Sequence, residues 1–196
     1  RIRFLIAPIF IIFLLYFSYS QIYQVAIAET SLKSAQNNQN IFTYQLIEQD
    51  FSTAIQAMPN EYILYQNFGN FLLTKSASGS NFIQKQNYLN TAIYNYLSAL
   101  KLNNYYSSTY NNLALAYFSL FDLTHNLKYK TLGKEAMYNA VQKGTNNPRY
   151  LYEYARKLYI YFNDKKDAIK YLKKALQINP NYQEPQDYLN FIHTST

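Results

Sequence analysis

The chain is poor in the residue types on which most enzyme chemistry depends. It has no cysteine, four glycines and two histidines among 196 residues. The absence of cysteine excludes disulfides, thiolate metal sites and a thiol nucleophile. The glycines are scattered, so there is no glycine-rich phosphate loop. His125 and His193 are the only histidines, and we expect neither to bind a metal or to act in catalysis. We therefore expect no enzyme activity, no cofactor and no metal site.

The N-terminal third also lacks the residues that interrupt helices. Phe4 to Phe17 contain no charged or amide side chain, and neither Gly nor Pro occurs from Ile9 to Met58. Pro8 suits the first turn of a helix, so we expect one helix from about residue 8 to residue 36. Its first half is apolar on all sides. Its second half carries one apolar stripe at a spacing of three or four, formed by Ile22, Val25, Ala28, Leu32 and Ala35.

The apolar half of this helix has three possible fates. It can span a bilayer, be removed as a signal peptide after Ala26-Ile27-Ala28, or be buried against copies of itself in a polymer. A spanning helix needs about 20 apolar residues, and residues 4–19 come close to that length. Arg1 and Arg3 would keep the N-terminus on the cytoplasmic side of a membrane by the positive-inside rule. The rest of the chain would then lie outside the cytoplasm.

The layout of residues 1–36 resembles that of type IV pilins. The chain begins with Arg1 rather than Met, as if processed just before its hydrophobic helix, and that helix is apolar and then amphipathic before a globular domain. Position 5 holds Leu5, where the best-known pilins carry an acidic residue. The resemblance implies a subunit whose N-terminal helices pack into the core of a filament.

A second pattern recurs through the rest of the chain. Its clearest copy lies near the C-terminus, at Tyr152, Ala155, Arg156, Tyr159, Ala168, Leu172, Ala175 and Pro180. These spacings resemble the tetratricopeptide repeat (TPR), a pair of antiparallel helices. Upstream copies are stretched by insertions, which we expect to form polar loops at residues 74–81 and 121–129, and a half-unit at residues 47–59 precedes them. In every copy two small or apolar positions of the second helix are seven residues apart (47–54, 92–99, 133–140 and 168–175), which puts both on one helix face.

The repeat resemblance implies a stack of helix pairs in which each pair covers the next. We predict an all-α fold of about nine helices, with a long N-terminal hydrophobic helix continuous with a TPR-like α-solenoid. The predicted domains are residues 1–28, a filament core or membrane anchor, and residues 29–196, the repeat domain. The predicted repeat-packing residues are Ala54, Pro59, Gly69, Ala92, Ala99, Ala114, Ala140, Ala155, Ala168, Ala175 and Pro180.

The distribution of charge and the number of tyrosines indicate possible binding partners. Of 18 basic residues, 12 lie between Lys128 and Lys174, where there are four acidic residues. This surplus would suit anionic glycans, lipid headgroups or a neighbouring subunit, or would form a solvated helical face; we expect no nucleic acid. The 23 tyrosines exceed what one core can hold. Exposed tyrosines such as Tyr105, Tyr150 and Tyr161 would favour homomeric contacts.

Together these features predict the structural subunit of an extracellular, pilus-like filament on a prokaryotic cell surface. The subunit would be anchored in the inner membrane, with an exoplasmic domain, before assembly into a helical homo-oligomer. Two alternatives stay open: a membrane-anchored extracytoplasmic TPR scaffold for protein–protein interaction, and the C-terminal TPR region of a larger envelope glycan polymerase or ligase. The predicted self-assembly residues are Phe4, Ile6, Ile9, Phe10, Ile12, Phe13, Leu14, Tyr16 and Phe17.

Overall fold

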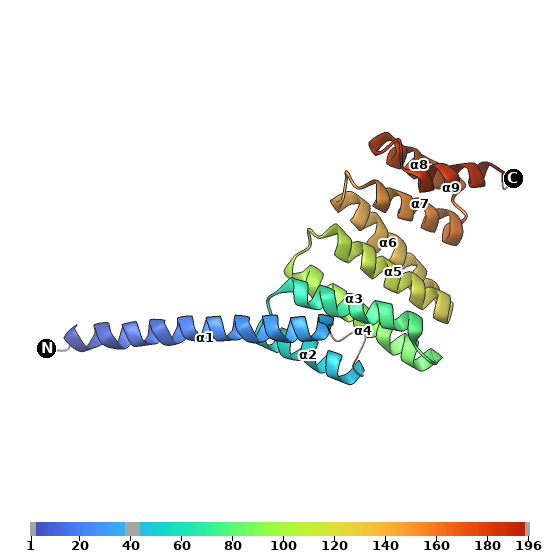
Figure 1. The fold of residues 1–196 in the computed structure, drawn as a ribbon. Helices are drawn as coiled ribbons and strands as arrows, with labels where there is room; N and C mark the ends of the chain where they lie inside the picture. Colours follow the sequence, from blue (N-terminus) through green and yellow to red (C-terminus); the bar gives the residue numbers. More distant parts are fainter. Residues whose placement is uncertain (1–2, 38–43, 195–196) are drawn as a thin grey trace. The chain divides into compact units, whose positions relative to one another are not determined.

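The computed structural model describes the backbone of residues 3–37 and 44–194, and the side chains of residues 14–37 and 45–194. Over these ranges the chain forms nine helices and no strand, which confirms the predicted all-α class (Figure 1). The helices are α1 (Arg3–Asn37), α2 (Tyr44–Ala57), α3 (Tyr62–Ser78), α4 (Phe82–Leu102), α5 (Ser107–Thr124), α6 (Leu127–Lys143), α7 (Pro148–Phe162), α8 (Lys165–Ile178) and α9 (Gln183–Thr194).

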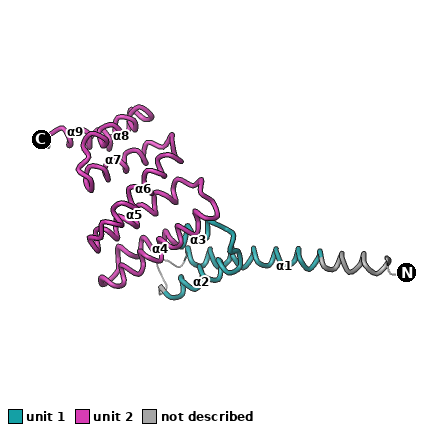
Figure 2. The backbone as a smooth tube through the Cα atoms, turned by 180° about the vertical axis from the view of Figure 1, so that it is seen from behind, with its two compact units in different colours: residues 1–68 teal, residues 69–196 magenta. Residues whose placement is uncertain are grey.

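The chain divides into two compact units, residues 1–68 and residues 69–196 (Figure 2). Helix α3 contributes its first turns to the first unit and its remainder to the second. The predicted boundary between residues 28 and 29 separates an N-terminal segment from the repeat domain. It does not coincide with the boundary between the two compact units, and it stays a prediction.

The first unit is held together by α1, α2 and the start of α3. Helices α1 and α2 pack against each other, and the buried residues Ala28, Ala54 and Leu64 meet in one cluster. The rings of Phe51 and Phe68 stack with centroids 4.9 Å apart. The predicted half-unit at residues 47–59 thus supplies the core of this unit.

The described residues do not support the predicted long hydrophobic helix at the N-terminus. The structure describes no helix that is long and apolar enough to cross a membrane. Within the described side chains of α1, the exposed run from Leu14 to Phe17 is short and is followed by polar residues at Ser18, Ser20 and Gln21. Of the predicted self-assembly residues, Leu14, Tyr16 and Phe17 are exposed. The others, Phe4, Ile6, Ile9, Phe10, Ile12 and Phe13, lie outside the described side chains.

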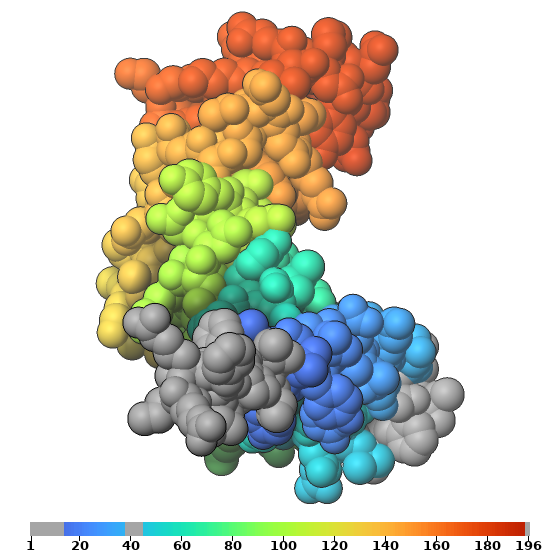
Figure 3. Space-filling model, turned by 90° about the vertical axis from the view of Figure 1, so that its left-hand side faces the viewer, coloured from blue at the N-terminus to red at the C-terminus, as the bar shows by residue number. Residues whose placement is uncertain are grey.

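The second unit is a stack of helices in which each contacts the next, from α4 through α9. In the space-filling view its helices are layered in sequence order, from green to red (Figure 3). The small residues of the repeat pattern are buried: Gly69, Ala92, Ala99, Ala114, Ala140, Ala155, Ala168 and Ala175 in the second unit, and Ala54 in the first. Their role in packing the helix pairs stays a prediction. Pro59 and Pro180 are exposed, because each lies in a turn between helices.

The predicted polar loops are shorter than expected because helices extend into them. Helix α3 continues to Ser78, and Thr74 and Ser78 each donate a side-chain hydrogen bond to a backbone carbonyl of the preceding turn. Helix α5 continues to Thr124, and His125 ends it in a left-handed conformation with φ 55°. Serine and threonine hydroxyls can bond within a helix in this way, so their presence did not require a loop.

Candidate protein-binding surfaces

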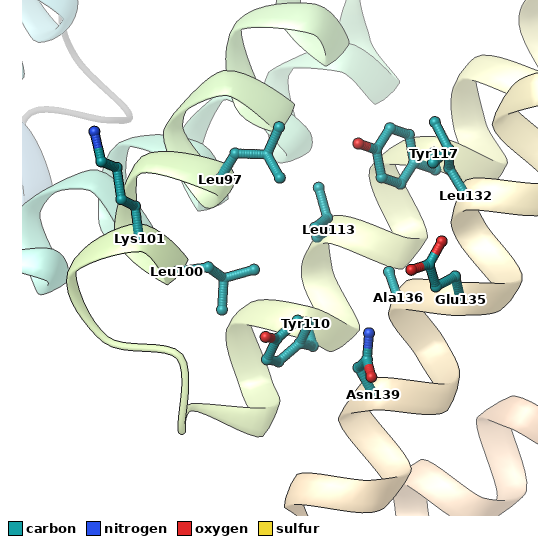
Figure 4. A pocket seen from close by; sticks show the side chains of 10 residues that line it. All are labelled: Leu97, Leu100, Lys101, Tyr110, Leu113, Tyr117, Leu132, Glu135, Ala136 and Asn139. Atoms are coloured by element: carbon teal, nitrogen blue, oxygen red, sulfur yellow. The ribbon is translucent and has the colours of Figure 1, made fainter.

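A groove lies between α4, α5 and α6 and encloses about 340 Å³ (Figure 4). We call it the first groove. Each helix contributes residues spaced by three or four, which places them on one helix face. The lining residues are Leu97, Leu100 and Lys101 from α4, Tyr110, Leu113 and Tyr117 from α5, and Leu132, Glu135, Ala136 and Asn139 from α6.

The first groove has a buried apolar floor and a mixed rim. Leu100, Leu113 and Ala136 are buried, whereas Leu97 is 48% exposed. Lys101 and Glu135, both exposed, give the rim one charge of each sign. Burial, followed by the nearby Glu135 carboxylate, raises the pKa of Tyr117 above its usual value. The apolar floor can bury an apolar side chain of a ligand.

A second groove of about 350 Å³ lies one helix pair further along the chain. Val141 occupies the same repeat position as Leu100 of the first groove, since each directly follows a buried alanine of the repeat pattern. Both are buried. The second groove is lined by Val141, Gln142, Thr145, Leu151, Tyr171, Lys174, Gln177 and Ile178.

Three tyrosine rings pack together beside the second groove. The ring of Tyr154 lies 4.8 Å from that of Tyr171 and 6.2 Å from that of Tyr138. Tyr154 is 5% exposed, and burial raises the pKa of its hydroxyl from 10.0 to about 12. The cluster joins α6, α7 and α8 through aromatic contacts that favour edge-to-face geometry.

Alkaline pH is expected to destabilise the fold through this cluster. Tyr154 has a pKa of about 12 in the folded state against 10.0 for an ordinary tyrosine, so the unfolded state binds fewer protons between these pH values. The contribution of Tyr154 to the free energy of unfolding is fully present below pH 10. It falls by roughly 2 kcal/mol as the pH rises to about 12. Urea denaturation below pH 10 and near pH 12 would measure it. Tyr154→Phe should reduce the loss and Tyr94→Phe, at an exposed ring, should not; equal behaviour of the two variants would contradict the assignment.

An amide cluster connects α3, α4 and α5 in the second unit. Asn70 accepts hydrogen bonds at its side-chain oxygen from the Tyr96 hydroxyl (3.0 Å) and from the Asn112 amide (2.8 Å). The Asn111 amide donates to the side-chain oxygen of Asn112 over 3.2 Å. Within the described residues, the side-chain oxygens of Asn111 and Thr109 are buried without a hydrogen-bond partner. The cluster fixes the register of three helices by side-chain hydrogen bonds.

Several basic residues of the 128–174 region lie over aromatic rings instead of pointing freely into solvent. The Lys157 ammonium is 5.3 Å from the ring centroids of Phe118 and Tyr161, and burial lowers its pKa. Tyr161, predicted to be exposed, stacks on Phe118 at 4.6 Å and donates a 2.7 Å hydrogen bond to Asp122. Part of the positive surplus therefore serves packing between α5 and α7.

The two histidines lie at the ends of helices. His125 ends α5 and its ring lies edge-on to Phe121, and His193 lies in the last turn of α9. In the part of the chain that the structure describes, no group of three or more His, Cys, Asp and Glu residues could hold a metal ion.

Comparison with known proteins places the fold. No family model matches the chain, and no curated protein matches it. Among solved structures, it is similar to MamA (TM-score 0.64, 14% identity, 90% of this chain and 82% of that one). It is also similar to TTC0263, a thermophilic TPR protein of Thermus thermophilus (TM-score 0.64, 16% identity, 85% and 78%). A third similarity is to a chain of the Cut9–Hcn1 hetero-tetramer of APC/C (TM-score 0.61, 20% identity, 86% and 30%).

These similarities confirm the TPR-like fold and correct the predicted function. They give no support to the pilin-like resemblance. The prediction of an extracellular, pilus-like filament subunit is wrong, as is the predicted location on a cell-surface filament reached from an inner-membrane anchor, because the neighbours have TPR folds and no described helix could span a membrane. The prediction rested on the layout of residues 1–36 and on the apolar stretch from Phe4 to Phe17, and apolar character in a sequence does not show what covers the side chains.

Proposed function

We propose that the chain is a protein-interaction scaffold in which the first groove binds an apolar side chain from a segment of a partner protein. The observation that carries the proposal is the groove itself: an apolar floor of about 340 Å³ with the half-exposed Leu97 on its rim. An exposed apolar surface with polar surroundings is typical of protein–protein contact sites. Lys101, Glu135 and Asn139 surround the floor and can orient the main chain of a bound segment through hydrogen bonds.

The TPR-like fold supports this proposal at a coarse level. A stack of helix pairs presents long surfaces whose shape depends on nearest-neighbour packing, and such surfaces suit binding to extended protein segments. Binding of this kind requires no reacting group, which agrees with the scarcity of catalytic residue types in the sequence.

Within the proposal, residues 29–196 form the repeat domain and residues 1–28 a segment with a separate role. Ala28 is the first buried residue among the described side chains of α1. Residues 14–17 are exposed and contribute no described contact to the repeat packing.

Replacing Leu97 tests the proposed site directly. A photo-crosslinking residue at position 97 should trap a partner in cells of the source organism, and the purified partner should then bind the full chain. Leu97→Gln is expected to weaken that binding about tenfold, because it removes an apolar contact from the groove rim. Glutamine is a good helix former, so α4 should remain intact. Isothermal titration calorimetry would measure the change.

Leu102→Gln is the matched control. Leu102 is 41% exposed on the same helix but does not line the groove. Its substitution should leave the affinity within about twofold of the original. Equal losses in the two variants, or no loss with Leu97→Gln, would contradict binding at the first groove.

A further inference from the structure

The second groove differs from the first in the charge of its surroundings. Its lining includes Lys174 and, among the described lining residues, no Asp or Glu. The lining of the first groove includes both Lys101 and Glu135, one charge of each sign. A ligand at the second groove therefore meets a cationic rim around an apolar floor.

Helix α8 supplies most of this positive charge. It contains five lysines against one acidic residue, Asp167. Lys166, Lys170, Lys173 and Lys174 are exposed. Lys170 lies 3.9 Å from Asp167 at the surface, a distance and exposure that leave its charge largely available. Lys174 forms no ion pair within the described residues.

Two of these lysines are positioned by an aromatic ring that lines the groove. The ammonium groups of Lys170 and Lys174 lie 5.7 Å and 5.5 Å from the centroid of Tyr171. Contact with the ring face favours a cation at that place and restricts where the side chains point. Lys174 lines the groove together with Leu151 and Ile178, and Lys170 lies over the ring of Tyr171, which also lines it.

We propose that the second groove binds an acidic protein segment that carries one bulky apolar side chain. The apolar side chain would enter the cavity of about 350 Å³ between Leu151, Tyr171 and Ile178. Carboxylates flanking it in sequence would meet Lys170 and Lys174. This inference rests on the proposed scaffold function and adds the chemistry of a partner at a separate surface.

The geometry favours a protein segment over an anionic bilayer as the occupant. The apolar surface of the second groove is recessed, and its floor includes Val141 and Leu151, both buried. A side chain projecting from a peptide can reach such a floor, whereas a bilayer meets a protein best through projecting apolar groups. The exposed cations attract acidic segments and steer them toward the groove.

Fluorescence anisotropy with the full chain tests the proposal. The probe is a short labelled peptide rich in Asp and Glu with one central Phe; the comparison peptides replace that Phe by Ser or all carboxylates by amides. We expect saturable binding of the Phe peptide, at least about tenfold tighter than either comparison peptide, and weaker binding as salt increases.

Matched variants locate the binding. The double variant Lys170→Gln/Lys174→Gln should weaken binding about tenfold, whereas Lys165→Gln/Lys166→Gln, which removes the same charge from the same helix, should change it about twofold. Ile178→Gln should also weaken binding, while Ile160→Gln, at a residue 55% exposed on α7, should not. Thermal unfolding of each variant would show that the fold is retained.

Several outcomes would overturn the proposal. Equal affinity for the Phe and Ser peptides, or equal losses in the two lysine pairs, would mean that only diffuse charge attraction operates. Tight binding to phosphatidylserine vesicles that Ile178→Gln leaves unchanged would identify a membrane surface instead. If the peptide fails but crosslinking from residue 97 succeeds, the second groove lacks this role and the scaffold function stands; if both fail, the scaffold function fails too.

Discussion

Gly69→Val is expected to lower the free energy of unfolding by about 3 kcal/mol. A Cβ atom at position 69 would lie 2.7 Å from Cε1 and 2.9 Å from Cδ1 of Tyr96, well inside the contact distance of about 3.5–4.0 Å between carbon atoms. Tyr96 is fully buried and its hydroxyl donates to Asn70, so the ring has no free space into which to move. Valine adds two further methyl groups to this overlap.

The other glycines provide a graded comparison. Gly69→Ala should cost less, about 2 kcal/mol, because alanine regains about 1 kcal/mol of helix propensity. At Gly133 the added atom would lie 3.1 Å from the ring of Phe118, so a smaller loss is expected. At Gly79 it would meet Cγ of the flexible Lys85 side chain, and Gly79→Ala should be close to neutral.

Urea denaturation followed by circular dichroism would measure this series. The expected order of destabilisation is Gly69→Val, Gly69→Ala, Gly133→Ala and then Gly79→Ala, with similar dependence on urea concentration if the cooperative unit is unchanged. A neutral Gly69→Ala would mean that α3 and α4 are further apart than the contact with Tyr96 indicates.

The helix pairs could be predicted from sequence because their packing imposes a local pattern. Two helices that cross closely need small residues at the contact, and a seven-residue interval keeps two such positions on one face. Ala92 with Ala99 and Ala168 with Ala175 satisfy this rule, and all four are fully buried. The pattern therefore indicated the fold class, and the residues that it singled out for packing include these four buried alanines.

The grooves could not be predicted in the same way. Leu97, Tyr110 and Leu132 are far apart in sequence and meet only because α4, α5 and α6 pack in one order. Each helix does carry a stripe of groove-lining residues at three- and four-residue spacing, but such a stripe is equally typical of a helix face buried in a core. Only the exposed fraction of Leu97, 48%, distinguishes a groove rim from an interior position.

The function was mispredicted where the evidence was the composition and layout of a segment. Residues 4–17 are apolar and the 128–174 region is basic, and composition left several possible surroundings open for each. In the structure Lys157 packs over Phe118 and Tyr161, so part of that charge is used internally. Side-chain geometry, which composition does not contain, decides whether a basic or apolar residue is available to a partner.

Phe51→Ala is expected to destabilise the first unit by about 3–5 kcal/mol. Phe51 is fully buried in α2, and its ring stacks on Phe68 with centroids 4.9 Å apart and an interplanar angle of 18°. Removing the ring loses its transfer free energy and leaves a cavity that the surrounding side chains can fill only partly. An aromatic pair of this kind adds about 0.5–1.5 kcal/mol beyond the buried area.

Phe82→Ala is the matched control for this prediction. Phe82 is 50% exposed at the first position of α4, so its replacement should change the free energy of unfolding by less than about 1 kcal/mol. Hydrogen exchange would then locate the effect. Because Phe51 belongs to residues 1–68, amides of α2 should lose protection in Phe51→Ala before those of α8, which belongs to residues 69–196. Equal loss in both helices would instead mean that the two compact units unfold as one cooperative structure, and that the repeat stack depends on the ring at position 51 as much as the first unit does.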